Sequence, residues 1–241
     1  MTALSKNQAR DSQLYWVADN IIAPDFPPTS SALRDPNGLL AIGGTLDSGR
    51  IIDAYRRGIF PWYSEGQPVL WWSPNPRCVL EPDELKISKS LAKVLRRDTY
   101  KTTFNQAFAE VIRACAAPRQ ASADTWLTGE MIAAYTALHA TGRALSVECW
   151  QGQELVGGLY GLVIGRVFFG ESMFSRKRDA SKVALVNLVS KLRQHDFRLI
   201  DCQIHSPHLQ SLGAKPIPRE LFVNILKHYC QPDIAYQWGT Q

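Results

Sequence analysis

The segment from residue 165 to 181 has the sequence GRVFFGESMFSRKRDAS. Its apolar run, Val167 to Phe169, predicts a buried strand that leads to a single acid, Glu171. A basic cluster at 176–178 follows, and helical spacing resumes at Ser181. The segment therefore predicts a strand-to-helix connection with one carboxylate between an apolar pocket and a cationic rim. Such a pocket suits a ligand that has one apolar part and one charged part.

The elements around this segment indicate the fold class. Three strands are expected at 144–150, 155–163 and 166–173, with tight glycine turns between them. A helix at 181–194 and a strand at 198–203 are expected to follow. Meandering strands followed by a helix and a further strand are typical of an N-acyltransferase-like α+β fold.

The same pattern predicts how the chain is divided. We expect a leader at 1–20, a smaller N-terminal α/β module at 21–90, and an acetyltransferase-like (GNAT-like) domain at 91–241. The predicted fold class is therefore α+β, with two unequal modules.

Composition limits the partners and the compartment. The 241 residues include 27 Lys+Arg and 22 Asp+Glu, so the formal charge is +5, which suits a polyanionic partner without proving one. The five scattered cysteines form no C-x-x-C pair, which predicts a reduced cytoplasmic protein without a zinc site. No signal peptide is evident, and no apolar run approaches the ~20 residues of a membrane helix. His205 and His208 lack a Cys or an acid at ligand spacing, so no metal site is expected.

Two tryptophans are candidates for stacking on a base. Trp62 lies between a proline and a polar loop, and it forms either a stacking platform, worth roughly 1–3 kcal/mol per base, or part of the module core. Trp126 precedes a helix that Thr128 can cap, and it forms either a second stacking surface or a hydrophobic staple. Of the strand neighbours Trp71 and Trp72, at least one is expected in the core, because adjacent strand residues point to opposite faces.

A basic stretch spans the start of the GNAT-like domain. Four of its cations share one face of an expected helix: Lys89, Lys93, Arg96 and Arg97. The face either binds phosphates or is an ordinary solvated surface.

Three polar residues stand out in the expected strands. Glu171 lies in apolar sequence and needs a partner, either an internal cation or a ligand amine. Asp201 and Gln203 lie two residues apart, so both are expected on one strand face, where they either orient an amine nucleophile or form a strand-end hydrogen-bond network. The segment that leads into the helix expected at 181–194, residues 172–181, has no glycine that would let backbone N–H groups hold a pyrophosphate. Acyl-coenzyme A is therefore a poor candidate for the acyl donor of such a fold.

Several short motifs in one order resemble the leucyl/phenylalanyl-tRNA–protein transferase family. They are PNGLLA at 36–41, RGIFPW at 57–62, LWWSP at 70–74, GESMFS at 170–175, ASK at 180–182, DCQ at 201–203, and His208 with SLGA at 211–214. The resemblance implies an aminoacyltransferase of the cytoplasm that needs no cofactor. It implies transfer of leucine or phenylalanine from aminoacyl-tRNA to proteins with N-terminal Arg or Lys, which marks them for degradation under the N-end rule.

The resemblance also implies roles for individual residues. Trp62 and Trp126 would hold the terminal adenosine of the tRNA, and the basic helix would take its acceptor-stem phosphates. Glu171, Asp201 and Gln203 would form the reaction centre. We hypothesise that Gln203 accepts a hydrogen bond from the amine, that Asp201 fixes the orientation of its amide, and that Glu171 faces the cationic acceptor residue or amine. Four apolar residues would line the aminoacyl pocket: Leu159, Phe168, Leu188 and Ile200.

Two pocket positions differ from other family members. Leu159 stands where methionine occurs, and Leu188 stands where phenylalanine occurs, so the preference between leucine and phenylalanine is not predicted. Two other function classes remain open on the residues alone. One is an N-acyltransferase that uses acyl-coenzyme A, and the other is a non-catalytic RNA-binding protein.

Overall fold

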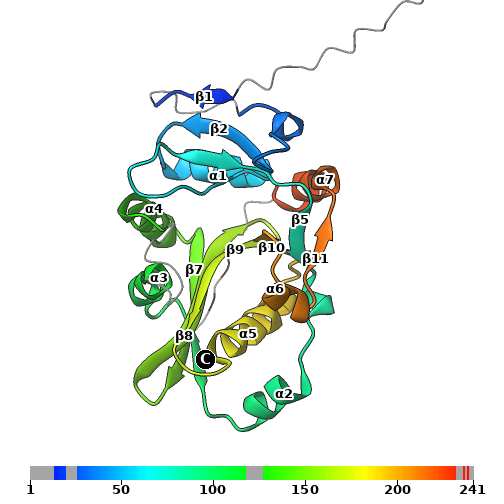
Figure 1. Cartoon of the computed structure of the whole chain (residues 1–241). Coiled ribbons are helices and arrows are strands. Elements are labelled where there is room, and N and C mark those ends of the chain that lie inside the picture. The colour runs from blue at the N-terminus through cyan, green and yellow to red at the C-terminus, as the bar shows by residue number, and fades with distance from the viewer. Residues whose placement is uncertain (1–13, 20–25, 118–126, 232–235, 237, 239–241) are drawn as a thin grey trace, which may run out of the picture.

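The computed structural model describes residues 14–19, 26–117, 127–231, 236 and 238 of the 241. Two sheets organise them, and Figure 1 shows the smaller sheet at the end of the molecule that carries β1. Among these residues, no helix is both long enough and apolar enough to cross a bilayer.

The N-terminal module consists of a four-stranded sheet and helix α1. The strand order is β1-β2-β4-β3, in which only β1 and β2 are parallel. The strands are β1 Tyr15–Val17, β2 Leu39–Gly43, β3 Phe60–Pro61 and β4 Leu70–Trp72. Helix α1, Ser48–Arg56, begins where the Asp47 side chain accepts a hydrogen bond from the backbone N–H of Arg50. It ends at Arg56, and Gly58 follows with a φ of +81°, a left-handed conformation that favours glycine.

The second module is built on a seven-stranded sheet of order β11-β5-β10-β9-β8-β7-β6. Its strands are β5 Arg77–Leu80, β6 Lys101–Phe104, β7 Ala144–Gln151, β8 Glu154–Ile164, β9 Val167–Ser175, β10 Leu199–Gln203 and β11 Lys215–Ile217. Strands β7, β8 and β9 form an antiparallel meander, and β10 pairs in parallel with β9 after the chain crosses over through α5. The expected order of three strands, a helix and a strand is confirmed.

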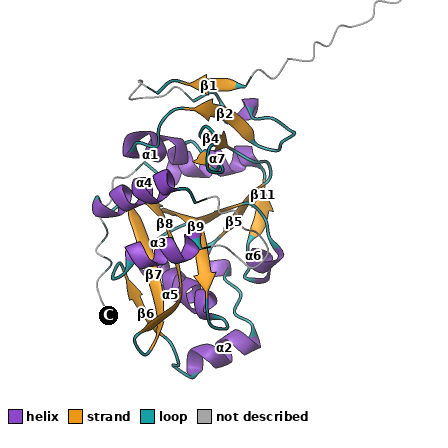
Figure 2. Cartoon of the chain, turned by 60° about the vertical axis from the view of Figure 1, so that its left-hand side comes forward, coloured by secondary structure: helices purple, strands orange, loops and turns teal. Residues whose placement is uncertain are grey.

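Helices cover both faces of this sheet. Helices α3, Phe108–Ala116, and α4, Gly129–Ala140, lie on one face, and α5, Ala180–Gln194, lies on the other (Figures 1 and 2). Strand β8 is buried at every residue after its first, because its alternate side chains enter different cores. Tyr160 and Leu162 pack toward α3 and α4, whereas Leu159 and Val163 join the cluster beneath α5.

Three further helices complete the fold: α2 Lys89–Arg96, α6 Pro207–Ser211 and α7 Arg219–Tyr229. Short 3-10 turns occur at Thr29–Ser31 and Pro82–Glu84. Helix α7 packs against the N-terminal module. The ring of Phe222 lies so close to Gly58 that a Cβ added there would be 3.2 Å from it.

The predicted α+β fold class is confirmed, with a four-stranded sheet near the N-terminus and a larger seven-stranded sheet. The sheets add two long-range details. Strand β1 lies within the range 1–20 that was expected to be a leader. Strand β5 lies within the range 21–90, yet it belongs to the larger sheet because it pairs with β10 and β11.

Candidate active site

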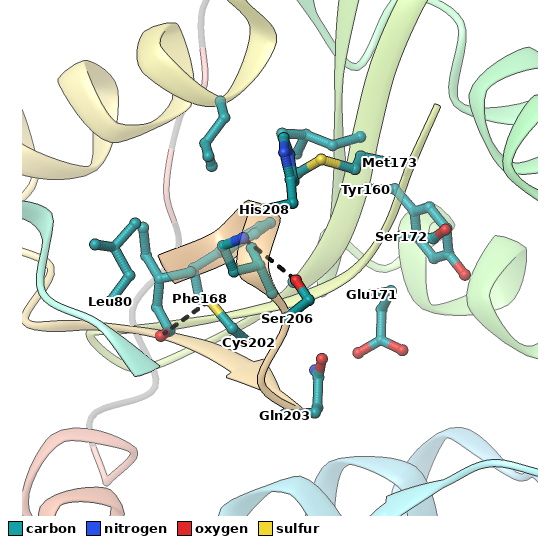
Figure 3. A pocket seen from close by; sticks show the side chains of 15 residues that line it. Leu80, Tyr160, Phe168, Glu171, Ser172, Met173, Cys202, Gln203, Ser206 and His208 are labelled. Atoms are coloured by element: carbon teal, nitrogen blue, oxygen red, sulfur yellow. Dashed lines mark hydrogen bonds between the residues drawn. The ribbon is translucent and has the colours of Figure 1, made fainter. Parts of the chain in front are cut away.

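A cavity of about 520 Å³ opens where β9 and β10 stop pairing (Figure 3). The last paired residues are Phe169 and Asp201. Beyond them, β9 continues along β8, and the next residues of both strands line the cavity instead of bonding to one another. The fold therefore creates the site at a divergence between two central strands.

The walls of the cavity are mainly apolar. Three of the four residues expected in the aminoacyl pocket line this cavity: Leu159, Phe168 and Ile200. The fourth, Leu188, does not line it and is fully buried in the core beneath α5. Leu185, three residues earlier on the same helix, lines the cavity in its place. Local spacing could not distinguish these two positions, because both lie on the inner face of α5.

Glu171 lies at the edge of this cavity with two tyrosine partners. The hydroxyls of Tyr55 and Tyr135 donate to its carboxylate oxygens at 2.7 and 2.8 Å, and they lie 2.8 Å from each other. Burial raises the pKa of Glu171 to about 7, although both hydroxyl hydrogen bonds oppose the rise. The sequence predicted a cation, either internal or from a ligand. The internal partners are hydroxyls instead, one from helix α1 and one from helix α4.

Gln203 and Glu171 lie together where two cavities adjoin. Both residues, with Cys202, line the large cavity and also a smaller one of about 130 Å³. The side-chain nitrogen of Gln203 is buried without a hydrogen-bond partner among the described residues. A buried polar atom of this kind requires a partner, and a ligand in either cavity would supply one. Figure 3 shows Glu171 and Gln203 on the same side of the large cavity.

Asp201 lies elsewhere than the sequence predicted. A bulge interrupts the pairing of β10 with β5 between Asp201 and Gln203, so the two side chains do not share a strand face. The Asp201 carboxylate is fully buried and accepts two hydrogen bonds from Arg77, at 2.8 and 2.6 Å. It also accepts the backbone N–H of Gln203 at 3.0 Å. Asp201 therefore makes no hydrogen bond to the side-chain amide of Gln203 and binds the backbone of that residue instead.

The tryptophans divide between the core and the site. Trp71 is fully buried and donates to the carbonyl of Gly43, as expected for one member of the pair. Trp62 is 40% exposed and lines the smaller cavity, and the Trp72 indole N–H donates to its carbonyl oxygen at 2.7 Å. Trp126, the other predicted stacking residue, lies outside the described residues.

The predicted basic face lies on α2, far from β1 in both views (Figures 1 and 2). Its four cations are exposed, and none forms an ion pair with another described residue: Lys89, Lys93, Arg96 and Arg97. The Tyr100 hydroxyl donates to the carbonyl of Arg178 at 3.0 Å, which holds the basic segment 176–178 near the end of α2. These cations are therefore available to an anionic partner.

Comparisons with known proteins agree with this arrangement. A family model described as "Leucyl/phenylalanyl-tRNA protein transferase" matches residues 79–227, and a model of the N-terminal domain of that family matches residues 44–75. The chain belongs to this family. It is therefore a transferase enzyme.

The similarity extends over nearly the whole chain. The leucyl/phenylalanyl-tRNA–protein transferase of Pseudomonas syringae pv. syringae (strain B728a) is 58% identical over 229 residues, which cover 95% of this chain and 99% of that protein. The same transferase of Pseudomonas paraeruginosa (strain DSM 24068 / PA7) is 59% identical over 205 residues, which cover 85% and 91%.

Similar solved structures are much more distant from this transferase. L-PGS from Bacillus licheniformis has 12% identity and a TM-score of 0.39, and the match covers 56% of this chain and 49% of that one. A GCN5-related N-acetyltransferase from Kribbella flavida has 10% identity and a TM-score of 0.34, with coverage of 66% and 56%.

Proposed function

We propose that the enzyme transfers leucine or phenylalanine from aminoacyl-tRNA to the α-amino group of proteins with N-terminal Arg or Lys. The reaction would take place in the cytoplasm and would mark those proteins for degradation under the N-end rule. The observation that carries the proposal is the apolar cavity of about 520 Å³ that ends at Glu171 and Gln203. Its volume falls within the ~300–1,000 Å³ that is usual for small-molecule sites.

The aminoacyl-tRNA donor places its amino-acid side chain in one cavity and its terminal adenosine in the other. Its apolar side chain occupies the large cavity against Leu159, Phe168 and Ile200, where burial of apolar surface favours leucine or phenylalanine over polar residues. The terminal adenosine lies in the smaller cavity, where the exposed indole of Trp62 offers a stacking surface. We assign the second stacking role to Trp126. The ester bond then lies where the cavities meet, between Glu171 and Gln203.

The reaction is aminolysis of an activated ester. The attacking α-amine has an ordinary pKa of ~7.7–8.0, so an appreciable fraction is neutral at cellular pH. Its nitrogen forms a bond to the carbonyl carbon, the ester C–O bond breaks, and the ribose oxygen that leaves takes up the proton of the amine. The side-chain oxygen of Gln203 accepts a hydrogen bond from the amine and holds it in line. An amide is too weak a base to keep the proton, so positioning supplies the rate, for which effective molarities of ~10⁵ M or more are attainable.

Glu171 supplies the charge that favours a basic acceptor. A cationic side chain near its carboxylate would lower the raised pKa of that group and favour its ionised form. The two tyrosine hydroxyls already donate to the carboxylate, so it needs no rearrangement when the acceptor arrives. The basic face of α2 would bind phosphates of the tRNA, because its cations are exposed and the chain has a formal charge of +5.

The test gives the purified enzyme leucyl-tRNA and two peptides, one beginning with Arg and one with Ala. We expect transfer to the Arg peptide only, without dependence on added coenzyme A. Gln203→Ala should lower turnover far more than tRNA affinity, since its amide acts on the amine and not on the tRNA. Transfer to neither peptide would overturn the proposal, and tRNA binding without transfer would identify an RNA-binding protein instead.

A further inference from the structure

Arg77 is a buried cation at the junction of three parts of the chain. Its side chain is fully buried, and the guanidinium lies between two aromatic rings, 4.7 Å from the centroid of Phe60 and 4.6 Å from that of Phe222. One nitrogen donates to the carbonyl of Gly58 at 3.2 Å, and two others bind Asp201. The rings fix the plane of the guanidinium, and the paired hydrogen bonds fix its direction.

Asp201 connects the fixed guanidinium of Arg77 to the backbone of Gln203. The same carboxylate oxygen that accepts Nε of Arg77 also accepts the backbone N–H of Gln203. Gln203 has a φ of +53°, a left-handed conformation that a residue with a side chain keeps only where its surroundings enforce it. The backbone turn at this residue aims its side chain at the junction of the two cavities.

Asp201 has no direct access to a substrate. It is fully buried and lines neither cavity. Its carboxylate hydrogen bonds within the described residues all go to Arg77 or to the backbone N–H of Gln203. A proton acceptor for the reaction would have to reach one of the cavities, so Asp201 acts only through the residue that it holds.

We propose that Arg77 is a positioning residue for aminoacyl transfer, and that Arg77 and Asp201 together form one unit that fixes the backbone of Gln203. The proposal rests on the role of Gln203 in the proposed function. It assigns a purpose to the contacts of Arg77 with Phe60 and Phe222. Through these contacts the N-terminal module and α7 set the direction of the Gln203 amide.

The test compares Arg77→Gln, Arg77→Lys, Asp201→Asn and the double variant Arg77→Gln/Asp201→Asn with the unchanged enzyme. The matched control is Arg50→Gln, because Arg50 is another fully buried guanidinium that binds the carbonyl groups of Thr45 and Ala18 and lines neither cavity. For each variant, kcat and KM for leucyl-tRNA are measured together with the thermal unfolding midpoint.

We expect kcat to fall about 10²-fold in Arg77→Gln with an unchanged KM, since a misplacement of about 1 Å in a positioned group has an effect of this size. Arg77→Lys keeps the charge and the fold but loses the planar, paired contact, so it should show the same loss. The double variant should lose no more than the worse single variant, because both changes disable one unit. Arg50→Gln should lower the unfolding midpoint while keeping kcat. Loss of kcat in Asp201→Asn with full kcat in both Arg77 variants would overturn the proposal.

A second measurement does not depend on activity. The backbone N–H resonance of Gln203, observed in glutamine-labelled enzyme, should shift in Arg77→Lys and Asp201→Asn, because its carboxylate partner moves or becomes an amide. It should stay in place in Arg50→Gln. An unmoved resonance in Arg77→Lys overturns the positioning role, even where the unchanged enzyme transfers leucine normally. Shifted resonances in these variants, together with an unchanged enzyme that transfers nothing, support the positioning unit and refute the proposed function.

Discussion

Replacement of Glu171 by glutamine should stabilise the enzyme at alkaline pH. The folded chain raises the pKa of this carboxyl from 4.5 to about 7, chiefly through burial. The folded state therefore binds the proton more tightly than the unfolded state does, and protonation favours folding. This contribution is fully present below pH 4.5 and is lost as the pH rises through 7. The free energy of unfolding of the unchanged enzyme should accordingly fall across that interval.

The size of the effect follows from the pKa change. A carboxyl whose pKa rises from 4.5 to about 7 loses about 3 kcal/mol of stability in its ionised form. The cavity is open on one side, so water screens part of the burial, and we expect about 1–3 kcal/mol at pH 8. Glu171→Gln keeps the shape and the acceptor oxygen, removes the charge, and should gain this amount at pH 8 and almost nothing at pH 5.

Urea unfolding followed by tryptophan fluorescence at pH 5, 6, 7 and 8 measures the gain. A gain of about 2 kcal/mol moves the midpoint by roughly 1 M urea at a slope of about 2 kcal/mol/M. Tyr135→Phe is the opposing control. Its hydroxyl hydrogen bond lowers the pKa of Glu171, so its removal should enlarge the loss at high pH. An equal midpoint shift in Glu171→Gln at all four pH values would refute the reasoning, since a packing change does not titrate.

Four other variants separate the parts of the site. Trp62→Ala should weaken binding of aminoacyl-tRNA by roughly 1–3 kcal/mol, measured by filter binding, because the adenosine loses its stacking surface. Lys93→Ala with Arg96→Ala should weaken tRNA binding and reduce the slope of log K against log[salt] by about 0.7–0.9 per cation, and an unchanged slope would place the tRNA elsewhere. Leu188→Ala should cost about 2–5 kcal/mol of stability by chemical denaturation yet leave the KM ratio of leucyl- to phenylalanyl-tRNA unchanged. Leu185→Ala should alter that ratio, because Leu185, unlike Leu188, lines the cavity.

Local patterns predicted the central elements of the fold well. The strand expected at 198–203 and the helix expected at 181–194 appear as Leu199–Gln203 and Ala180–Gln194. Both have a strong apolar period bounded by polar residues, which is a property of adjacent residues only. The position of β5 in the larger sheet could not be predicted from such local patterns. Its pairing with β10 joins residues more than 100 positions apart, and the sequence of either strand alone does not identify its neighbour.

The same limit explains the polar residues of the site. Asp201 and Gln203 were expected on one strand face because period-two alternation was assumed, and a single bulge breaks that alternation. Tyr55 lies at helical spacing from Ile51, so its position predicts a core residue, and it is indeed fully buried. Its hydroxyl nevertheless reaches Glu171, 116 residues away in the chain. A tyrosine can bury its ring in the core while its hydroxyl forms hydrogen bonds in the site. A hydrophobic pattern in the sequence indicates only the buried ring.

These long-range contacts make the N-terminal module part of the candidate active site. Its helix α1 supplies Tyr55, which donates to Glu171, and its strand β3 supplies Phe60, which packs on Arg77. Trp62 follows directly and lines the smaller cavity. Without this module, Glu171 would lose one of its two hydroxyl donors, and the cation that holds Asp201 would lose one of its two rings. The larger sheet provides the divergent strands that form the cavity, and the smaller module provides the contacts that give its polar groups their direction.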